Sequence, residues 1–169
     1  GAGSNVIVNA AVSSGSGHVT LNAVNDVDVN VNASLSTGGA GTVFLTGAGI
    51  SLDASVTTEN GDVLISSTQE IIQTAAISST SGDVGLIAGT TITQSSSGDI
   101  TTTSGDVLVE AGTKWTMSNS TVITAGGGDF DGKALSGDLA LGRINAARTA
   151  LSASGDISDG NGTTLNVDG

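Results

Sequence analysis

The chain has 169 residues, with 26 Gly, no Pro, no Cys and only three aromatic side chains. Sixteen acidic residues against four basic ones give a net charge of −12, which repels nucleic-acid phosphates and anionic membranes. No apolar run reaches the roughly 18 residues that span a bilayer. Composition and charge therefore argue against nucleic-acid binding and membrane insertion.

Short stretches of alternating apolar and polar residues follow one another along the chain, a pattern typical of strands with one buried face. They fall into three sets that recur in order. The first set is Val19/Leu21, Val43/Leu45, Val63/Ile65, Val84/Leu86 and Val107/Val109. The second set is Val27/Val29, Ile50/Leu52, Ile72, Ile92 and Trp115/Met117. The third set is Leu35, Val56, Ile77, Ile100 and Val122.

The recurrence has a fixed period. Gly17, Gly41, Gly61, Gly82 and Gly105 are separated by 24, 20, 21 and 23 residues, and the third set of apolar residues repeats at similar intervals. A sandwich needs no such period, and a propeller blade needs about twice the length. We therefore predict an all-β parallel β-helix of about seven coils, with three short strands and 20–24 residues in each coil.

The stretches "NGDVLISSTQEIIQTAAISSTSGDVGLIAGTTITQ" and "SGDLALGRINAARTALSASGDISDGNGTTLNVDG" resemble the repeat region of filamentous haemagglutinin-type proteins, the exported surface adhesins of Gram-negative bacteria. The resemblance covers the chain from about residue 15. It implies a right-handed parallel β-helix, in line with the hand of parallel crossovers, and export to the bacterial cell surface. It also implies a structural or adhesive shaft role outside the cell.

The motif Ser-Gly-Asp followed by Val or Ile is predicted to form the corner between coils. Glycine there allows a positive φ, and aspartate hydrogen-bonds nearby backbone amides. The motif gives a column of aspartates, namely Asp62, Asp83, Asp106, Asp138 and Asp156. Asp62, Asp83 and Asp106 are the candidates for binding Ca²⁺, although solvated corner residues need no metal. We predict no cofactor, with a calcium-stabilised binding module as an open alternative.

An enzyme is the other alternative, because polysaccharide lyases and glycoside hydrolases also use parallel β-helices. Hydrolysis needs two placed carboxylates, and candidate neighbours across coils, such as Asp83 with Asp106, lie in short turns without an obvious groove. The basic residues do not recur in register with the acids; they are Lys114, Lys133, Arg143 and Arg148. His18, the one histidine, takes a corner position that aspartate holds later. We therefore predict a protein without catalytic residues.

Two kinds of bulky side chain stand out against this aliphatic sequence. Trp115 falls in an inward column and is predicted to fill the core, with sugar stacking as the alternative. Phe44, Leu64, Ile87 and Leu108 are predicted to point outward as one apolar stripe. Such a stripe indicates either a covering segment or a lateral contact surface.

The regular spacing breaks near residues 125–136, where "AGGGDFDGKA" is predicted to form an inserted loop. Apart from it, residues 1–169 are predicted to form a single β-helix segment of a larger repetitive protein. Unpaired strand edges at both ends favour self-association end to end, and the apolar stripe favours association side by side. A glycan or a protein on a host or neighbouring cell is the other partner we expect.

Overall fold

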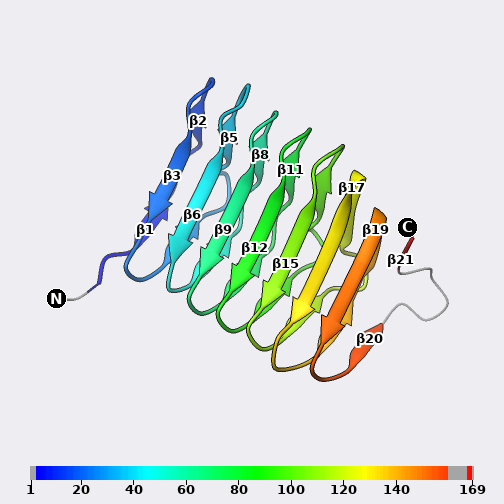
Figure 1. Ribbon diagram of the computed structural model, residues 1–169. Helices are drawn as coiled ribbons and strands as arrows, with labels where there is room; N and C mark the ends of the chain where they lie inside the picture. Colours follow the sequence, from blue (N-terminus) through cyan, green and yellow to red (C-terminus); the bar gives the residue numbers. More distant parts are fainter. Residues whose placement is uncertain (1–2, 160–166, 169) are drawn as a thin grey trace.

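The computed structural model describes residues 3–159 and 167–168. Its secondary structure over these residues consists of strands alone, and every strand pair is parallel. Each strand pairs with the equivalent strand of the next coil, so the chain winds into a right-handed parallel β-helix of about seven coils (Figure 1). The predicted fold class is confirmed.

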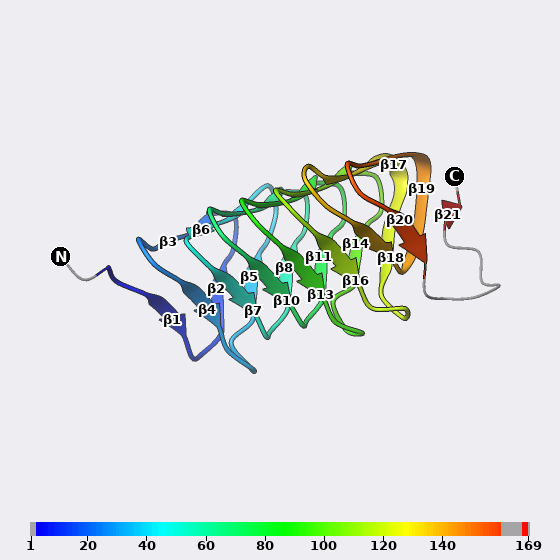
Figure 2. The ribbon, with the colours of Figure 1, turned by 90° about the horizontal axis from the view of Figure 1, so that it is seen from below.

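The strands lie on three faces that run along the rod. The first face, in view in Figure 2, contains β1 (Val6–Val8), β4 (Val27–Val29), β7 (Ile50–Leu52), β10 (Ile71–Gln73), β13 (Ile92–Gln94), β16 (Trp115–Met117), β18 (Leu139–Leu141) and β20 (Ile157–Asp159). The second face contains β2 (Val12–Ser14), β5 (Leu35–Thr37), β8 (Val56–Thr58), β11 (Ile77–Ser79) and β14 (Ile100–Thr102). The third face, in front in Figure 1, contains β3 (Val19–Asn22), β6 (Val43–Gly47), β9 (Val63–Ser67), β12 (Val84–Ala88) and β15 (Val107–Ala111). β17 (Val122–Ala134) and β19 (Arg143–Ala153) each continue from the second face into the third, and β21 (Val167–Asp168) pairs with β19.

The core consists of columns of aliphatic side chains that stack from coil to coil. On the third face Val43, Val63, Val84 and Val107 pair in sequence and are at most 1% exposed. Side chains alternate across a strand, so the residues between them point outward. Each coil thus contributes one layer to a narrow apolar interior, and the predicted alternation is the basis of the fold.

In two places the inward column lies one residue from its predicted position. Ile71 pairs with Ile50 and Ile92 and is fully buried, whereas Ile72 points outward and is 38% exposed. Likewise Ile123, not Val122, is the buried residue that pairs with Ile100. Two adjacent apolar residues leave the phase of the alternation undefined, and the neighbouring coils decide which of the two turns inward.

The corner glycines are required because successive coils approach each other closely. The predicted reason, a positive φ at these glycines, is wrong. Among the described residues the glycine with positive φ is Gly39, which lies outside the Gly-Asp motif. A Cβ on Gly82 would lie 2.1 Å from the carbonyl oxygen of Gly61, and a Cβ on Gly105 would lie 2.2 Å from that of Gly82. From Gly41 onward, each corner glycine of the third face therefore packs on the backbone of the preceding coil.

Trp115 is fully buried, which confirms the prediction that it fills the core. Its Nε1 donates to Oε1 of Gln94 at 2.8 Å, and Nε2 of Gln94 donates to Oε1 of Gln73 at 2.9 Å. The indole lies 5.8 Å from the ring of Phe130. A Cβ at Gly132 would lie 2.7 Å from Cζ3 of Trp115. The coil therefore encloses its largest side chain by placing a glycine beside it.

The prediction of an inserted loop at residues 125–136 is wrong, because most of this segment belongs to strand β17. Phe130 pairs with Val107, so Gly128-Asp129-Phe130 is the next corner after Gly105, 23 residues later. The prediction counted instead to Gly137, which precedes β18 on the first face. Phenylalanine in place of the usual valine or isoleucine concealed the motif, and the coil has an ordinary length.

Candidate functional site

The outward side of the third face gathers most of the residues predicted to bind a metal or a partner. Three columns run along it from coil to coil. The acidic column consists of Asp62, Asp83, Asp106 and Asp129. The apolar stripe consists of Phe44, Leu64, Gly85 and Leu108, and the outer column consists of Thr46, Ser66, Ile87, Glu110 and Lys133.

Each carboxylate of the acidic column accepts a hydrogen bond from the coil that follows. Oδ1 of Asp62 accepts from the amide of Asp83 at 2.9 Å, and Asp83 and Asp106 repeat the bond with the next aspartate at 2.8 Å. The predicted bond to a backbone amide exists, but it joins two coils. Within the described residues the Oδ2 atoms of Asp62, Asp83 and Asp106 accept no hydrogen bond, so one oxygen of each carboxylate faces solvent.

Asp138 and Asp156, which were predicted in the same column, belong to another corner of the coil. They precede Leu139 and Ile157 on the first face, and Oδ1 of Asp138 accepts from the amide of Asp156 at 3.0 Å. Asp26 repeats the arrangement near this corner, since its Oδ1 accepts from the amide of Gly49 at 3.0 Å. The same motif therefore serves two separate corners.

The acidic column has a different residue at each end. At one end the corner position is held by Thr42 and then, as predicted, by His18, whose Nδ1 accepts from the amide of Thr42 at 3.1 Å. At the other end Arg148 pairs with Asp129, with Nε to Oδ1 at 2.9 Å and Nη2 to Oδ2 at 2.5 Å. The Arg148 guanidinium lowers the pKa of Asp129 by hydrogen bonding, and desolvation partly opposes this shift. The same hydrogen bonds raise the pKa of Arg148.

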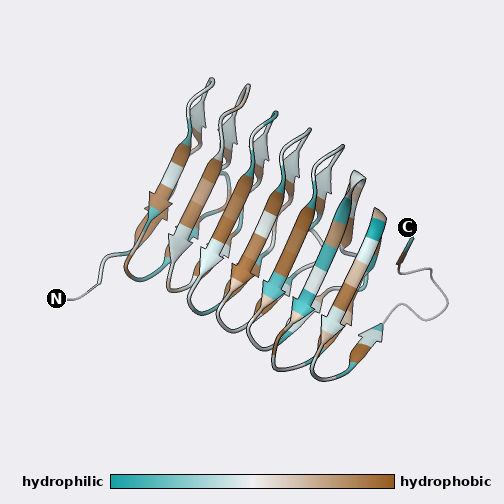
Figure 3. Ribbon diagram, viewed as in Figure 1, coloured by the Kyte–Doolittle hydropathy of each residue, from teal (hydrophilic) through white to brown (hydrophobic). Residues whose placement is uncertain are grey.

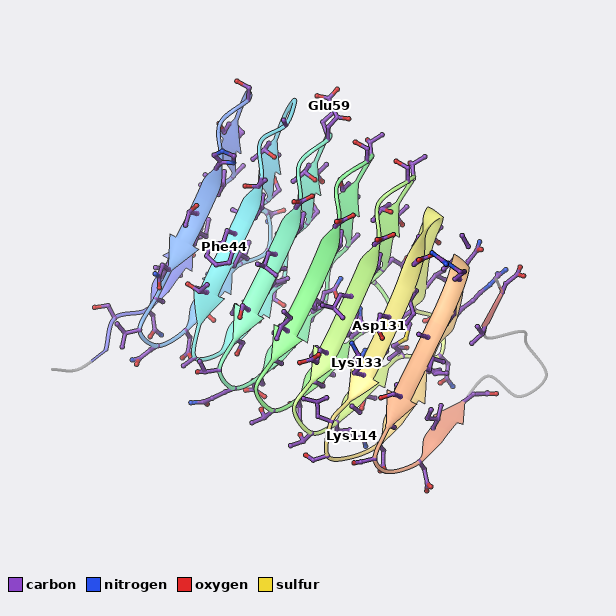
Figure 4. The ribbon with its side chains drawn as sticks, viewed as in Figure 1. Phe44, Glu59, Lys114, Asp131 and Lys133 are labelled. Carbon is purple, nitrogen blue, oxygen red and sulfur yellow. The ribbon has the colours of Figure 1, made fainter. Side chains whose placement is uncertain are left out.

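The apolar stripe contains three of the four residues predicted for a lateral surface. Phe44, Leu64 and Leu108 share one column, and Figure 4 shows Phe44 on the outward side of β6. Leu64 is 37% exposed, while Phe44 and Leu108 are half-buried. Ile87 is corrected to the outer column, because its partners are Ser66 and Glu110. Gly85 takes the place in the stripe that Ile87 was predicted to fill.

A hollow of about 440 Å³ opens over Gly85, where the stripe lacks a side chain. Leu64 and Leu108 lie on its two sides, and the carboxylates of the acidic column line it along one edge. The hollow extends over four coils, from Asp62 to Asp129. This face thus combines an apolar floor with a row of negative charges.

On β17, the strand after that of Leu108, the same face becomes polar and charged (Figure 3). Asp131 takes the place of the stripe on β17, and its carboxylate pairs with Nζ of Lys133 at 2.5 Å. Figure 4 shows both side chains on this strand. The bond to Asp131 and the charges of Asp131 and Glu110 raise the pKa of Lys133, against desolvation. Lys133 is therefore already engaged with its own chain.

The calcium candidates Asp62, Asp83 and Asp106 lie one above another, not around a common point. In the described part of the chain, no group of three or more histidine, aspartate or glutamate side chains is arranged to hold a metal ion. The described residues form strands and turns only, so none lies in an apolar helix of membrane-crossing length.

Asp129, Arg148 and Gly85 belong to this face but were not among the predicted site residues. Asp129 had a signal in the sequence, because "GGDF" repeats the Gly-Asp of "SGDV" with two substitutions. The pairing of Arg148 with Asp129 had no signal in the sequence. The corner of the next coil is two residues shorter, so the usual spacing does not place Arg148 beside Asp129. Between the paired positions, Ala147 alone stands opposite residues 126–128.

Comparison with known protein families, with curated proteins and with solved structures gives no match to this chain. The resemblance to filamentous haemagglutinin-type repeats thus depends on the Gly-Asp coils themselves.

Proposed function

We propose that the chain is a structural shaft segment of a secreted bacterial surface or filament protein, and that its third face is a lateral contact surface. The observation that carries this proposal is the apolar stripe on a regular β-helix whose corners are short. Soluble proteins seldom leave a row of apolar side chains uncovered without a contact role. A stack of near-identical coils also forms an elongated surface, which suits a spacer or a display role.

The partner of the shaft is a second shaft or a surface component of another cell, such as a glycan or a protein. Shafts associate side by side through the stripe, or end to end where strand edges are unpaired. The net charge of −12 opposes association of identical chains at low ionic strength. Salt screens this repulsion beyond about 8 Å at physiological ionic strength, so self-association should strengthen with salt.

Location is the direct test of the proposal. Antibodies against the chain should label intact cells of the source organism, and electron microscopy should place the label on surface filaments or fibres. A matched antibody against a cytoplasmic protein serves as the control and should label only permeabilised cells. Labelling that requires permeabilisation would contradict a surface shaft.

Light scattering across a salt series tests the lateral surface. We expect Phe44→Ser with Leu64→Ser to reduce salt-dependent association, because the double substitution removes two apolar contacts from the stripe. Ser13→Ala with Ser36→Ala on the outward side of the second face is the control and should leave association unchanged. Equal association of both double variants would exclude the stripe as the contact between copies.

The proposed shaft is not an enzyme. Its support is that Oδ1 of Asp83 and of Asp106 is already hydrogen-bonded to the backbone of the next coil. A carbohydrate-active enzyme is the competing function, because these carboxylates line the hollow. Incubation with neutral and uronate polysaccharides should release no product. Product formation that is lost in Asp83→Asn or Asp106→Asn would establish the enzyme instead.

A further inference from the structure

We propose that the hollow over Gly85 binds an extended arginine-bearing peptide segment of a partner protein. This inference deepens the lateral contact surface proposed above and commits it to one kind of occupant. The floor of the hollow is apolar, with Leu64 and Leu108 on either side of the missing side chain at Gly85. An arginine suits this combination, because its aliphatic stem packs on apolar surface while its guanidinium reaches outward to a carboxylate.

Charge favours a cationic occupant of the hollow over a second copy of the chain, whose association through the stripe requires salt to screen the acidic columns. Asp62, Asp83 and Asp106 each present an Oδ2 atom without a hydrogen bond from the described residues, next to the apolar floor. A second copy would bring a net charge of −12 and its own acidic column to this face. A basic segment instead pairs with the column and covers the stripe.

The chain already shows how the acidic column binds a guanidinium. Arg148 engages both oxygens of Asp129 although its side chain is 83% exposed. Such a two-point contact gives arginine an advantage over lysine at a carboxylate. In the three earlier coils the carboxylates of Asp62, Asp83 and Asp106 form no ion pair with a basic side chain of the described residues. An arginine from a partner can make the same contact there.

The spacing of the column favours arginine at every third residue of the partner. Aspartates two coils apart are separated by about 9.6 Å, twice the usual spacing of paired strands. Three residues of a polyproline II segment advance about 9.3 Å, so the first and fourth side chains point the same way at nearly that distance. A segment lying along the rod can thus reach Asp62 and Asp106 together, or Asp83 alone, since Arg148 already occupies both oxygens of Asp129.

A peptide with the sequence (Arg-Pro-Pro)₃, labelled with a fluorophore, is the probe, and fluorescence anisotropy at constant ionic strength is the measurement. We expect saturable binding that weakens at least about tenfold in Asp83→Asn/Asp106→Asn, since this pair removes one contact in either register. Asparagine retains an oxygen that accepts the amide of the next coil. Asp26→Asn/Asp138→Asn is the matched control, with the same loss of charge and the same bond to the next coil at another corner.

Gly85→Leu tests the floor of the hollow without any change of charge. Its Cβ would lie 3.0 Å from Cδ1 of Leu64, so the exposed end of Leu64 must move aside. The new side chain then occupies the hollow beside Leu108, and peptide binding should weaken by a similar factor. Equal weakening in the two asparagine pairs would show attraction to net charge alone and overturn the proposal, as would unchanged binding by Gly85→Leu. Sedimentation of the protein without peptide tests the remaining outcome. If the wild type formed dimers that Gly85→Leu abolishes, and if it bound no peptide, the hollow would be assigned to a second copy of the chain. None of these failures would contradict a surface shaft, which the antibody experiment tests by itself.

Discussion

The middle coils and the last coils of the rod turn the same corner in different ways. In the middle coils a buried hydroxyl closes the corner between the second and third faces, as where Oγ1 of Thr58 donates to the carbonyl of Gly61 and Oγ1 of Thr102 to that of Gly105. In the last coils Ala125 and Ala146 stand at this position, and strand pairing runs through the corner in β17 and β19.

This difference shows that the corner is specified by two separate features. The glycine permits the backbone of one coil to lie against the next, and it is present at Gly128 as well as at Gly105. The hydroxyl holds the turn closed by satisfying a buried carbonyl, and it is replaced by a methyl group after Thr102. At β17 the hydroxyl is lost while the glycine is kept, and the two short strands become one long one; at β19 the glycine is lost as well, because Ala147 alone stands at the corner.

The largest effect is expected where the two regions meet, at Trp115. Trp115→Ala removes a fully buried indole and leaves Oε1 of Gln94 without its donor. Substitutions of this kind cost about 3–5 kcal/mol. Unfolding in urea should therefore show a large fall in the free energy of unfolding.

A second substitution makes this prediction specific. Gly132→Val alone should destabilise the protein, because its Cβ would lie 2.7 Å from the indole of Trp115 and 2.8 Å from the ring of Phe130. Combined with Trp115→Ala it should recover part of the loss, because the valine fills the vacated space. Simple additivity of the two losses would contradict the pairing of a large residue with a small one.

The next largest effect is expected at the corner glycine, which the middle coils share with the first of the last coils, at Gly128. Gly105→Ala places a methyl group 2.2 Å from the carbonyl oxygen of Gly82, so the two coils must separate. We expect a loss of about 1–3 kcal/mol, the usual cost of overpacking, measured by thermal or urea unfolding. Gly15→Ala is the control, because a Cβ there has no neighbour within 4 Å. If both variants lost the same stability, the close approach of coils would not be the reason for the glycine.

A smaller effect is expected from the hydroxyl that distinguishes the two regions. Thr102→Ala removes the donor to the carbonyl of Gly105 and should cost about 1 kcal/mol. Thr101→Ala, one residue away and outside the core, should cost less. Hydrogen exchange should also show faster opening of the amides at this corner in Thr102→Ala. Protection equal to that of Thr101→Ala would show that the hydroxyl does not hold the turn.

The smallest effect concerns the exposed ion pair that ends the acidic column. Because Arg148 lowers the pKa of Asp129 in the folded protein, the pair stabilises the fold above the unfolded pKa of about 3.9. This contribution is lost as the pH falls from that value through the lower folded pKa. The stability difference between the wild type and Arg148→Ala should therefore be present at neutral pH and vanish in acid. Arg143→Ala, which forms no ion pair among the described residues, should show no such pH dependence.

The candidate site was predicted only in its separate parts. Alternation within one strand shows that Asp62 and Leu64 share the outward side, because residues two apart in a strand face the same way. The position of Ile87 depends on which residue of β12 stands beside Leu64, and that residue is Gly85. The hollow arises from this register between coils, so no single strand reveals it.

The sequence by itself determined the fold class, the length of a coil and the inward aliphatic columns, because alternation and period are local properties of the chain. The tertiary structure alone decided the phase at Ile71 and Ile123, the strand at residues 122–134 and the separate corner of Asp138. Each of these depends on how many residues every turn contributes before the chain returns to the same face. A difference in the length of one turn shifts every residue that follows it. The register between neighbouring coils is therefore selected only by their contacts, through buried side chains and backbone hydrogen bonds.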